Sequence, residues 1–365
     1  MRRTRWLAPA CVQRFLGTGR RGRRTGGPAL AWACLVVLIV GCASPPAALP
    51  EAPLPSPTPA APVVFPRDAG PHDALTEWWY YTGHLTASDG HAYGFEFVIF
   101  QVRRQDEPMG YLAHVAVSDI DGQTFSHQAK FTQSPVALTD FPLDVDGWTL
   151  DHQGSVDTIQ AALAPGAGVA SAFELRLSLQ DEKPPALHHG GYISYPQFGG
   201  SYYYSRTRLA VSGTLGDSPV SGTAWMDHQW GNFVIPTTGG WDWYSLQFDD
   251  NTEMMLYVLR SATGETTAVY GSLVQADGQV QDLASGQVTS TPVGSWTSPH
   301  TGAVYPSGWQ LTLADGSHIL VSPQLEDQEL WFPETPGLLQ YWEGAVSISG
   351  DRHGQGYVEL TGYAS

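Results

Sequence analysis

The chain has 365 residues, of which 42% are hydrophobic and 15% charged, and 35 acidic side chains against 18 basic ones give a formal charge of −17. Aromatic residues make up 12% of the sequence, which excludes a disordered acidic chain, because such chains lack the apolar surface that offsets the entropy cost of ordering. The acidic balance also excludes nucleic acid as a natural partner, since phosphate binding requires a basic face.

Residues 1–41 have the pattern of an export signal. They carry eight arginines and no acid, and an apolar run over 29–40 leads to Gly41 and Cys42. The run is shorter than the roughly 20 residues that span a bilayer, so we expect a removed signal peptide. Ile39-Val40-Gly41-Cys42 resembles the lipobox of bacterial lipoproteins, which predicts an exported lipoprotein held at a cell-envelope membrane by a lipid on Cys42, with its folded body outside the cytoplasm. A plain signal peptide is the alternative.

Cleavage before Cys42 changes two properties of the chain. The mature protein retains 10 basic and 35 acidic residues, a formal charge of −25, and Cys42 as its single cysteine. A disulfide within the chain and a cysteine metal site are therefore excluded. Residues 42–62, with eight prolines between 44 and 62, are predicted to be an extended linker.

The folded body is predicted to be all-β. Short strand-like runs bounded by Gly, Asp and Pro follow one another without a long amphipathic helix; they cover 93–102, 114–119, 173–179, 208–215, 244–248, 254–259, 268–275, 309–313, 318–325, 345–349 and 356–362. About sixteen to twenty strands exceed one sandwich, so we expect two antiparallel barrels. A cluster of turn-forming residues at 235–240 predicts an N-terminal domain over 63–235 and a C-terminal domain over 236–365.

Aromatic residues concentrate in four segments together with acids or histidine: 77–84, 200–206, 224–231 and 241–245. Successive side chains of a strand point to opposite faces. His228 and Trp230 are therefore expected on one face and Asp227 and Gln229 on the other. Any one segment is consistent with an ordinary β core, but acid, imidazole and amide among tryptophans favour a small-molecule pocket, because burying them without partners is costly.

Other chemistries find little support in the sequence. The twelve histidines show no HxH or HExxH spacing, so we predict no metal site and no cofactor. The G-x-S-x-G elbow of serine hydrolases and the glycine-rich nucleotide motifs are absent as well.

The segments EWWYYTGHL (77–85), YYYSRTRL (202–209), GTAWMDHQWGNF (222–233), WDWYSLQF (241–248), YWEGAVSISG (341–350) and GQGYVELTGY (354–363) resemble the AttH-like, carotenoid 1,2-hydratase family, whose members are often labelled predicted secreted hydrolases. The resemblance implies a tandem of two lipocalin-like barrels. Family members include hydratases that add water to an isolated alkene and pericyclases with an aromatic pocket between the barrels.

The same resemblance implies a set of catalytic residues: Asp227, His228, Trp230, Trp241, Asp242 and Tyr244. The aromatic segments supply the candidate substrate-binding residues: Glu77, Trp78, Trp79, Tyr81, Tyr202, Tyr204 and Trp243. In this hypothesis Asp227 or Asp242 stays protonated in an apolar wall and donates a proton to an alkene. Tryptophan faces then stabilise the carbocation, and His228 orients or deprotonates water.

Three functions are open at this point. The first is a cofactor-independent hydratase, isomerase or related lyase that acts on a lipophilic alkene. The second is a lipoprotein that binds or carries a hydrophobic small molecule without changing it. The third is a glycan-active or glycan-binding protein, for which the separation of Asp227 and Asp242 is diagnostic. The sequence does not indicate an oligomeric state.

Overall fold

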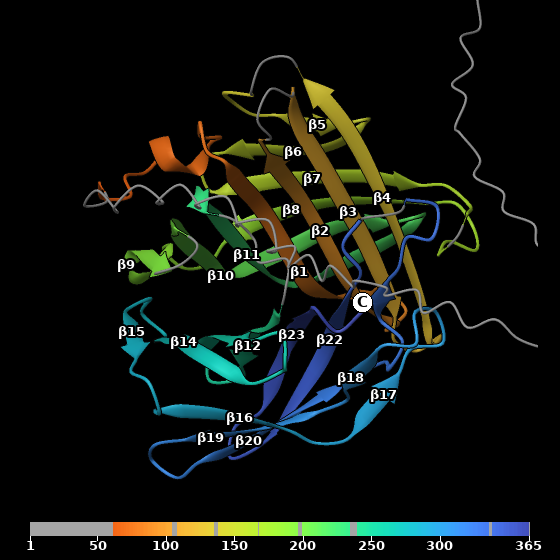
Figure 1. Cartoon of the computed structure of the whole chain (residues 1–365). Coiled ribbons are helices and arrows are strands. Elements are labelled where there is room, and N and C mark those ends of the chain that lie inside the picture. The colour runs from red at the N-terminus through yellow and green to blue at the C-terminus, as the bar shows by residue number, and fades with distance from the viewer. Residues whose placement is uncertain are drawn as a thin grey trace, which may run out of the picture. The chain divides into compact units, whose positions relative to one another are not determined.

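The computed structural model of the protein describes residues 61–103, 108–134, 138–166, 168–195, 199–233, 239–335 and 338–364. The predicted leader, Cys42, the linker up to residue 60 and the domain boundary at 235/236 lie outside these ranges. The described residues are almost entirely β-structure, with one short 3-10 helix, η1 (Arg67–Ala69) (Figure 1). No helix in the described part of the chain is long and apolar enough to cross a bilayer.

The first barrel is an eleven-stranded antiparallel sheet. Its strands are β1 (Thr76–Ala87), β2 (Ala92–Val102), β3 (Met109–Asp119), β4 (Thr124–Ser134), β5 (Leu143–Val145), β6 (Trp148–Gln153), β7 (Val156–Leu163), β8 (Phe173–Asp181), β9 (Ala186–Tyr195), β10 (Gly199–Leu215) and β11 (Ser218–Phe233). They lie in the order β4-β3-β2-β1-β11-β10-β8-β7-β6-β5, with β9 paired to β10. Because β5 also contacts β3 and β4, the sheet curls round and nearly closes.

The second barrel repeats this plan with shorter strands (Figure 1). Its strands are β12 (Gly240–Phe248), β13 (Glu253–Arg260), β14 (Thr266–Val274), β15 (Val280–Leu283), β16 (Val288–Pro292), β19 (Trp309–Leu313), β20 (His318–Pro323), β21 (Glu329–Leu330), β22 (Tyr341–Gly350) and β23 (Gly354–Thr361). The order is β15-β14-β13-β12-β23-β22-β20-β19-β16, with β21 paired to β22. A separate hairpin joins β17 (Ser295–Thr297) to β18 (Val304–Pro306).

Local sequence explains the turns between these strands. β5 and β6 are joined by the two residues Asp146 and Gly147, both at positive φ (53° and 84°). Two-residue hairpin loops of this type require positive φ at both positions, which Asp-Gly tolerates well. The all-β class and the tandem of two antiparallel barrels, predicted from the strand runs and the family resemblance, are confirmed.

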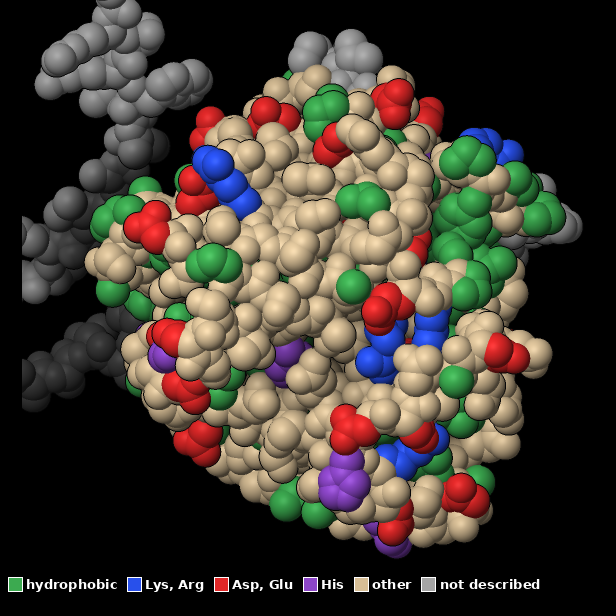
Figure 2. Space-filling view, turned by 180° about the vertical axis from the view of Figure 1, so that it is seen from behind, with side chains coloured by type: hydrophobic (Ala, Val, Ile, Leu, Met, Phe, Trp, Pro, Cys, Tyr) green, Lys and Arg blue, Asp and Glu red, His purple; other side chains and the backbone are tan. Residues whose placement is uncertain are grey.

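Each barrel has its own apolar interior. Trp79 and Trp148 are fully buried in the first, and Tyr244, Trp309 and Trp342 in the second. Apolar surface removed from water is the main stabilising contribution in both, at roughly 25 cal/mol per Å². The outer face shown in Figure 2 carries scattered acidic side chains and fewer basic ones, as the acidic composition leads one to expect.

A third apolar cluster lies between the barrels, where β1 packs against β23, β2 against β22 and β10 against β12. It contains Tyr80 and Trp225 from the first barrel and Trp243, Met255 and Tyr357 from the second. Much of the outer face of these strands is therefore removed from solvent by the other barrel.

A buried ionic contact, here called the interbarrel clamp, also joins the two halves. Lys183 Nζ lies 2.8 Å from Glu253 Oε2, and Arg208 Nε lies 2.7 Å from Glu253 Oε1. Lys183 and Arg208 belong to the first barrel, and Glu253 begins β13 of the second. Removal of one partner from such a buried group leaves an uncompensated charge, so the clamp ties the folding of the barrels together.

Candidate functional site

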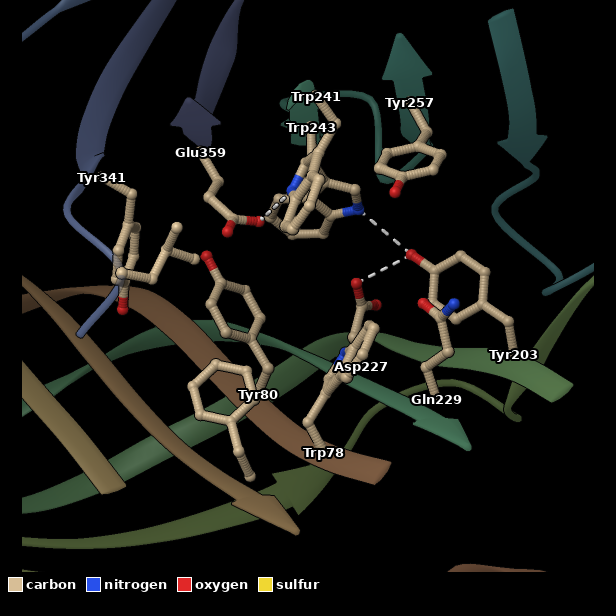
Figure 3. A pocket seen from close by; sticks show the side chains of 12 residues that line it. Trp78, Tyr80, Tyr203, Asp227, Gln229, Trp241, Trp243, Tyr257, Tyr341 and Glu359 are labelled. Atoms are coloured by element: carbon tan, nitrogen blue, oxygen red, sulfur yellow. Dashed lines mark hydrogen bonds between the residues drawn. The ribbon is translucent and has the colours of Figure 1, made fainter. Parts of the chain in front are cut away.

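A pocket lies between the outer faces of the two barrels (Figure 3). We call it the interbarrel pocket; it holds about 690 Å³ of empty space, part of it open to solvent. Its walls are aromatic side chains, two carboxyl groups, an amide and a leucine: Trp78, Tyr80, Phe100, Tyr203, Asp227, Gln229, Trp241, Trp243, Tyr257, Leu339, Tyr341 and Glu359. This composition is typical of a site for a largely apolar molecule with a few oriented polar groups.

Strand alternation decides which residues of β11 reach the pocket. Asp227 and Gln229 line it, whereas His228 and Trp230 point into the first barrel, as the alternation predicted. Strand β1 behaves in the same way, because Trp78 lines the pocket while Trp79 is part of the interior cluster.

Strand β12 contributes the facing wall. Trp241 and Trp243 line the pocket, and Asp242 and Tyr244 lie on the opposite face. Asp242 Oδ1 accepts from Arg260 Nε at 2.9 Å, which partly offsets the rise that burial causes in the Asp242 pKa. The structure therefore does not bring Asp227 and Asp242 into one site.

Asp227 is held by donors on its own side of the pocket. Tyr203 donates to Oδ2 at 2.7 Å, Trp225 Nε1 donates to Oδ1 at 2.7 Å, and the Ser205 hydroxyl also donates to Oδ1. Burial raises the Asp227 pKa to about 7 in spite of these hydrogen bonds. Trp243 Nε1 extends the network by donating to the Tyr203 oxygen at 3.1 Å (Figure 3).

Glu359, on β23, is a second carboxyl group in the pocket, on the wall opposite Asp227 (Figure 3). Its Oε2 accepts from Trp241 Nε1 at 3.0 Å, and burial together with the charge of Asp227 raises its pKa to about 7. Sequence reasoning did not select Glu359. The sequence feature that points to Glu359 is an acid within the otherwise apolar run Tyr357-Val358-Glu359-Leu360.

Two further carboxyl groups are buried beside the pocket. Glu343 is paired in register with Glu359 across β22 and β23, so both side chains lie on the same face of the sheet. Glu96 accepts a hydrogen bond from the Tyr341 hydroxyl at 2.7 Å, and His114 Nδ1 lies 2.8 Å from the same hydroxyl. Burial raises the Glu96 pKa to about 8, and burial with the neighbouring acids raises that of Glu343 well above its usual range.

On the inner face of the first barrel, Glu77, His72 and His228 form a compact hydrogen-bonded group. Glu77 Oε1 lies 2.6 Å from His72 Nδ1 and 2.8 Å from His228 Nε2, and the backbone N–H of His72 donates to Oε2 at 2.8 Å. Burial opposes ionisation of Glu77, but the hydrogen bonds of His228 and His72 prevail and lower its pKa.

These three residues offer donor atoms within 4.8 Å of one another, a set that could bind a metal ion. In the structure the carboxylate already uses both oxygens on the two histidines, and Gln101 Nε2 adds a fourth contact at 3.3 Å. Such a group is satisfied without a metal. His72 also stacks on Trp230, with ring centroids 4.1 Å apart, so the group fastens the segment before β1 to the barrel.

The remaining residues selected from sequence lie around this inner group. Trp79 and Tyr204 contact the ring of His228, and Tyr202 stacks on Trp230 at 5.0 Å. Tyr81 donates to Asp157 inside the barrel at 2.7 Å. Of the thirteen non-lipidated residues selected, Asp227, Trp241, Trp78 and Trp243 line the interbarrel pocket.

Comparison with known proteins agrees with this architecture. The chain matches the AttH-like family over residues 56–363. A crystal structure assigned to AttH, from Nitrosomonas europaea, is 31% identical with a TM-score of 0.76, over 84% of this chain and 99% of the other. The structure of kievitone hydratase from Nectria haematococca shares the fold at 16% identity and a TM-score of 0.66, over 83% of this chain and 93% of that one. Comparison with curated protein sequences gives no match. The matched span and the two aligned barrels show that this chain belongs to the AttH-like family.

Proposed function

We propose that this protein is a cofactor-independent hydratase or isomerase-like enzyme that acts on a lipophilic alkene in the interbarrel pocket. The observation that carries the proposal is the pair Asp227 and Glu359, two buried carboxyl groups with pKa values raised to about 7 on opposite walls of an aromatic pocket. At neutral pH one can hold a proton while the other is ionised, which is the arrangement that acid–base catalysis requires.

In the proposed reaction Glu359 is the general acid. Its O–H proton moves to one alkene carbon, the π electrons form the new C–H bond, and the other carbon becomes a tertiary cation. The oxygen of a water molecule then forms a C–O bond to that carbon, and the Asp227 carboxylate takes the proton that water releases. The product is a tertiary alcohol, and the proton returns from Asp227 to Glu359 through solvent. Loss of a neighbouring proton instead of water attack gives the isomerised alkene.

The hydrogen bonds determine which carboxyl group has which role. Asp227 accepts from three side chains, whereas Glu359 accepts from Trp241 and feels the charge of Asp227. Donors stabilise the ionised form and a neighbouring negative charge destabilises it. Asp227 therefore ionises first, as a base must, and Glu359 keeps its proton.

The lining also suits the cationic intermediate. Trp78, Trp241 and Trp243 present indole rings to the pocket, and a desolvated indole face stabilises a positive charge by about 2 kcal/mol. The base assigned from the family resemblance, His228, lies on the other face of β11 against Glu77. The present proposal therefore gives the proton-accepting role to Asp227.

Family membership and fold support this proposal without naming a substrate. The AttH-like family match covers nearly all of the folded body, and a protein named kievitone hydratase has the same fold. A fold hosts more than one chemistry, so the residues of the pocket carry the argument.

The test uses the full chain and an acyclic polyisoprenoid such as squalene in ¹⁸O-labelled water. We expect a product heavier by one labelled water, formed about 10²–10⁴-fold more slowly by Glu359→Gln and by Asp227→Asn. Glu265→Gln, at an exposed acid, is the control and should keep the parent rate. Equal rates in folded parent and variants would reject the mechanism. Squalene recovered unchanged but bound to the pocket would favour the alternative, a carrier of hydrophobic ligands.

We also propose, from the sequence of residues 1–62, that a lipid on Cys42 holds the enzyme at a cell-envelope membrane, close to substrates that dissolve in lipid. Labelled palmitate should enter the parent and not Cys42→Ser, and the variant should appear in the soluble fraction. Incorporation of label into both would contradict the assignment of Cys42.

A further inference from the structure

The surroundings of the interbarrel pocket hold four carboxyl groups without a basic partner in the part of the chain that the structure describes. Asp227 and Glu359 line the pocket, and Glu96 and Glu343 are buried beside it. Among the described residues no lysine, arginine or histidine lines it. Buried acids ordinarily have a basic partner or several donors, because an isolated ionised carboxylate is strongly destabilised in an apolar environment.

The basic groups nearest in the fold are engaged elsewhere. Arg260 pairs with Asp242 on the far face of β12. Burial lowers the pKa of His114 and of His188 to about 3, so both are neutral. Lys183 and Arg208 are held by the interbarrel clamp.

A second observation is independent of the charge. Both carboxyl oxygens of Glu343 and Oε2 of Glu96 are buried without a hydrogen bond of good geometry among the described residues. The donor beside Glu343 is the hydroxyl of Tyr80, which lines the pocket and also lacks a partner of good geometry within the described ranges. Glu343 is 1% exposed and lies on the same face of the sheet as Glu359, which lines the pocket. An unpartnered buried polar group costs about 1–3 kcal/mol, and a ligand that supplies a donor removes this cost.

We propose that the interbarrel pocket binds a lipophilic ammonium ion, with the charged nitrogen between Glu343 and Glu359 and the hydrocarbon chain against Trp78, Trp241 and Trp243. An ammonium N–H supplies Glu343 with a charged donor, which the neutral Tyr80 hydroxyl beside it is not. Its charge is attracted both by the carboxylates and by the indole faces, which is how aromatic cages recognise organic cations. This cation site shares its pocket with the proposed function, and ligand binding there does not require that the protein convert a substrate.

The class of ligand follows from a comparison of anionic, neutral and cationic lipids. An anionic lipid would face four acids without a basic partner. A neutral alcohol such as geraniol would fill the apolar walls and donate its O–H to Glu343, but it brings no positive charge to stabilise an ionised carboxylate. A lipophilic cation places its hydrocarbon chain against the tryptophans and its charge beside the carboxyl groups. It also has the same charge as the carbocation of the proposed reaction.

The experiment compares three geranyl compounds with one chain and different head groups: N,N-dimethylgeranylamine, geraniol and geranic acid. Isothermal titration with the full chain at pH 7 should show the amine binding at least about tenfold more tightly than geraniol, and geranic acid most weakly. Glu343→Gln should remove most of the preference for the amine and leave geraniol affinity unchanged. Glu265→Gln is the matched control for net charge and should behave as the parent.

A second measurement does not depend on any variant. Titration in buffers of different ionisation enthalpy reports protons released on binding. Because burial keeps carboxyl groups of this cluster protonated, the amine should release up to one proton per molecule bound at pH 6, whereas geraniol should release none. The titratable groups facing the cluster are Asp227, Glu359, Tyr80, Tyr203, Tyr341, Tyr357 and His114. Tyrosines with raised pKa values and a neutral histidine do not contribute protons at pH 6.

The outcomes separate the two proposals. Equal affinities for amine and geraniol, or a preference that survives Glu343→Gln without proton release, would overturn the cation site. Hydration of squalene in that case would leave the proposed function intact. The converse result, tight amine binding without any hydration, would retain the cation site and reject the enzyme.

Discussion

The two faces of the sheet at strands β1 and β11 border groups of acids among aromatic residues that have opposite electrostatic character. On the inner face Glu77 meets His72, His228 and Gln101, all its oxygens are paired and its pKa is lowered. On the outer face the acids in and beside the pocket have raised pKa values, and Glu343 has no hydrogen bond of good geometry to any described residue. An acid and a histidine among tryptophans therefore do not identify an active site. The unsatisfied acids distinguish the site from the structural group.

The sharpest test of this comparison is Glu77→Gln. Loss of the carboxylate leaves ring nitrogens of buried His228 and of half-buried His72 without their hydrogen-bond acceptor, and each buried polar group left unsatisfied costs about 1–3 kcal/mol. We expect a large drop in the free energy of unfolding in urea. Glu359→Gln, the same chemical change on the outer face, should leave stability unchanged or raise it. Equal losses in the two variants would contradict the distinction.

The pH dependence of stability should separate the faces as well. Glu96 has its pKa raised from 4.5 to about 8 in the folded protein. The folded state therefore holds a proton that the unfolded chain releases, and the free energy of unfolding should fall between pH 4.5 and pH 8, by up to about 1.4 kcal/mol per unit for one group. Glu96→Gln should remove the Glu96 contribution to this slope in urea titrations, while Asp227, Glu359 and Glu343, whose pKa values are also raised, keep theirs.

Glu77 should change the free energy of unfolding with pH in the opposite direction. Its pKa is lowered on folding, so the stability it contributes is present above its unfolded pKa and lost as the pH falls through the folded one. Parallel changes of the unfolding free energy in the parent and in Glu96→Gln from pH 5 to pH 8 would count against the raised Glu96 pKa.

A bell-shaped profile is expected for catalysis. Rates with squalene should be greatest near pH 7, because Asp227 gains a proton below that pH and Glu359 loses one above it. Each limb should approach tenfold per pH unit. In Glu359→Gln the alkaline limb should disappear from the residual rate, and its persistence would assign the acid to another group.

The smallest expected effect concerns the tryptophans. Trp241→Leu removes an indole that lines the pocket and donates to Glu359, and we expect the affinity for N,N-dimethylgeranylamine to fall about fivefold. Trp296→Leu, in the separate hairpin of the second barrel, is the control and should leave the titration unchanged. An equal loss of affinity in both variants would show that the Trp241 indole makes no specific contribution to binding.

Much of the architecture was accessible from sequence because it depends on local patterns. Alternation placed Asp227 and Gln229 opposite His228 and Trp230, and Trp241 and Trp243 opposite Asp242, as the structure shows. The Asp146-Gly147 turn is local in the same sense, because an Asp-Gly pair favours the positive φ angles that the two-residue loop requires.

The pocket itself was less accessible, because alternation does not say which face of a strand meets the other barrel. Glu359 is 118 residues from Trp241, its hydrogen-bond donor. Glu96 and Tyr341 are 245 residues apart. The first pair is created by the pairing of β12 with β23 inside the second barrel, and the second by the packing of one barrel on the other. Neither periodicity nor composition carries a signal for such distant contacts.

The interbarrel clamp provides complementary charges on the two halves of the chain, which matter if the halves are produced as separate fragments. If the chain is divided between Phe233 and Gly239, Lys183 and Arg208 remain on one fragment and Glu253 on the other. Each fragment then exposes an apolar wall with a charge that matches its counterpart. Because Lys183 and Arg208 attract Glu253, the clamp would favour association of the co-expressed halves and reassembly of the pocket. Glu253→Lys in one half would place like charges together and prevent assembly. The protein is in this sense a natural template for a split reporter whose signal is the reassembled pocket.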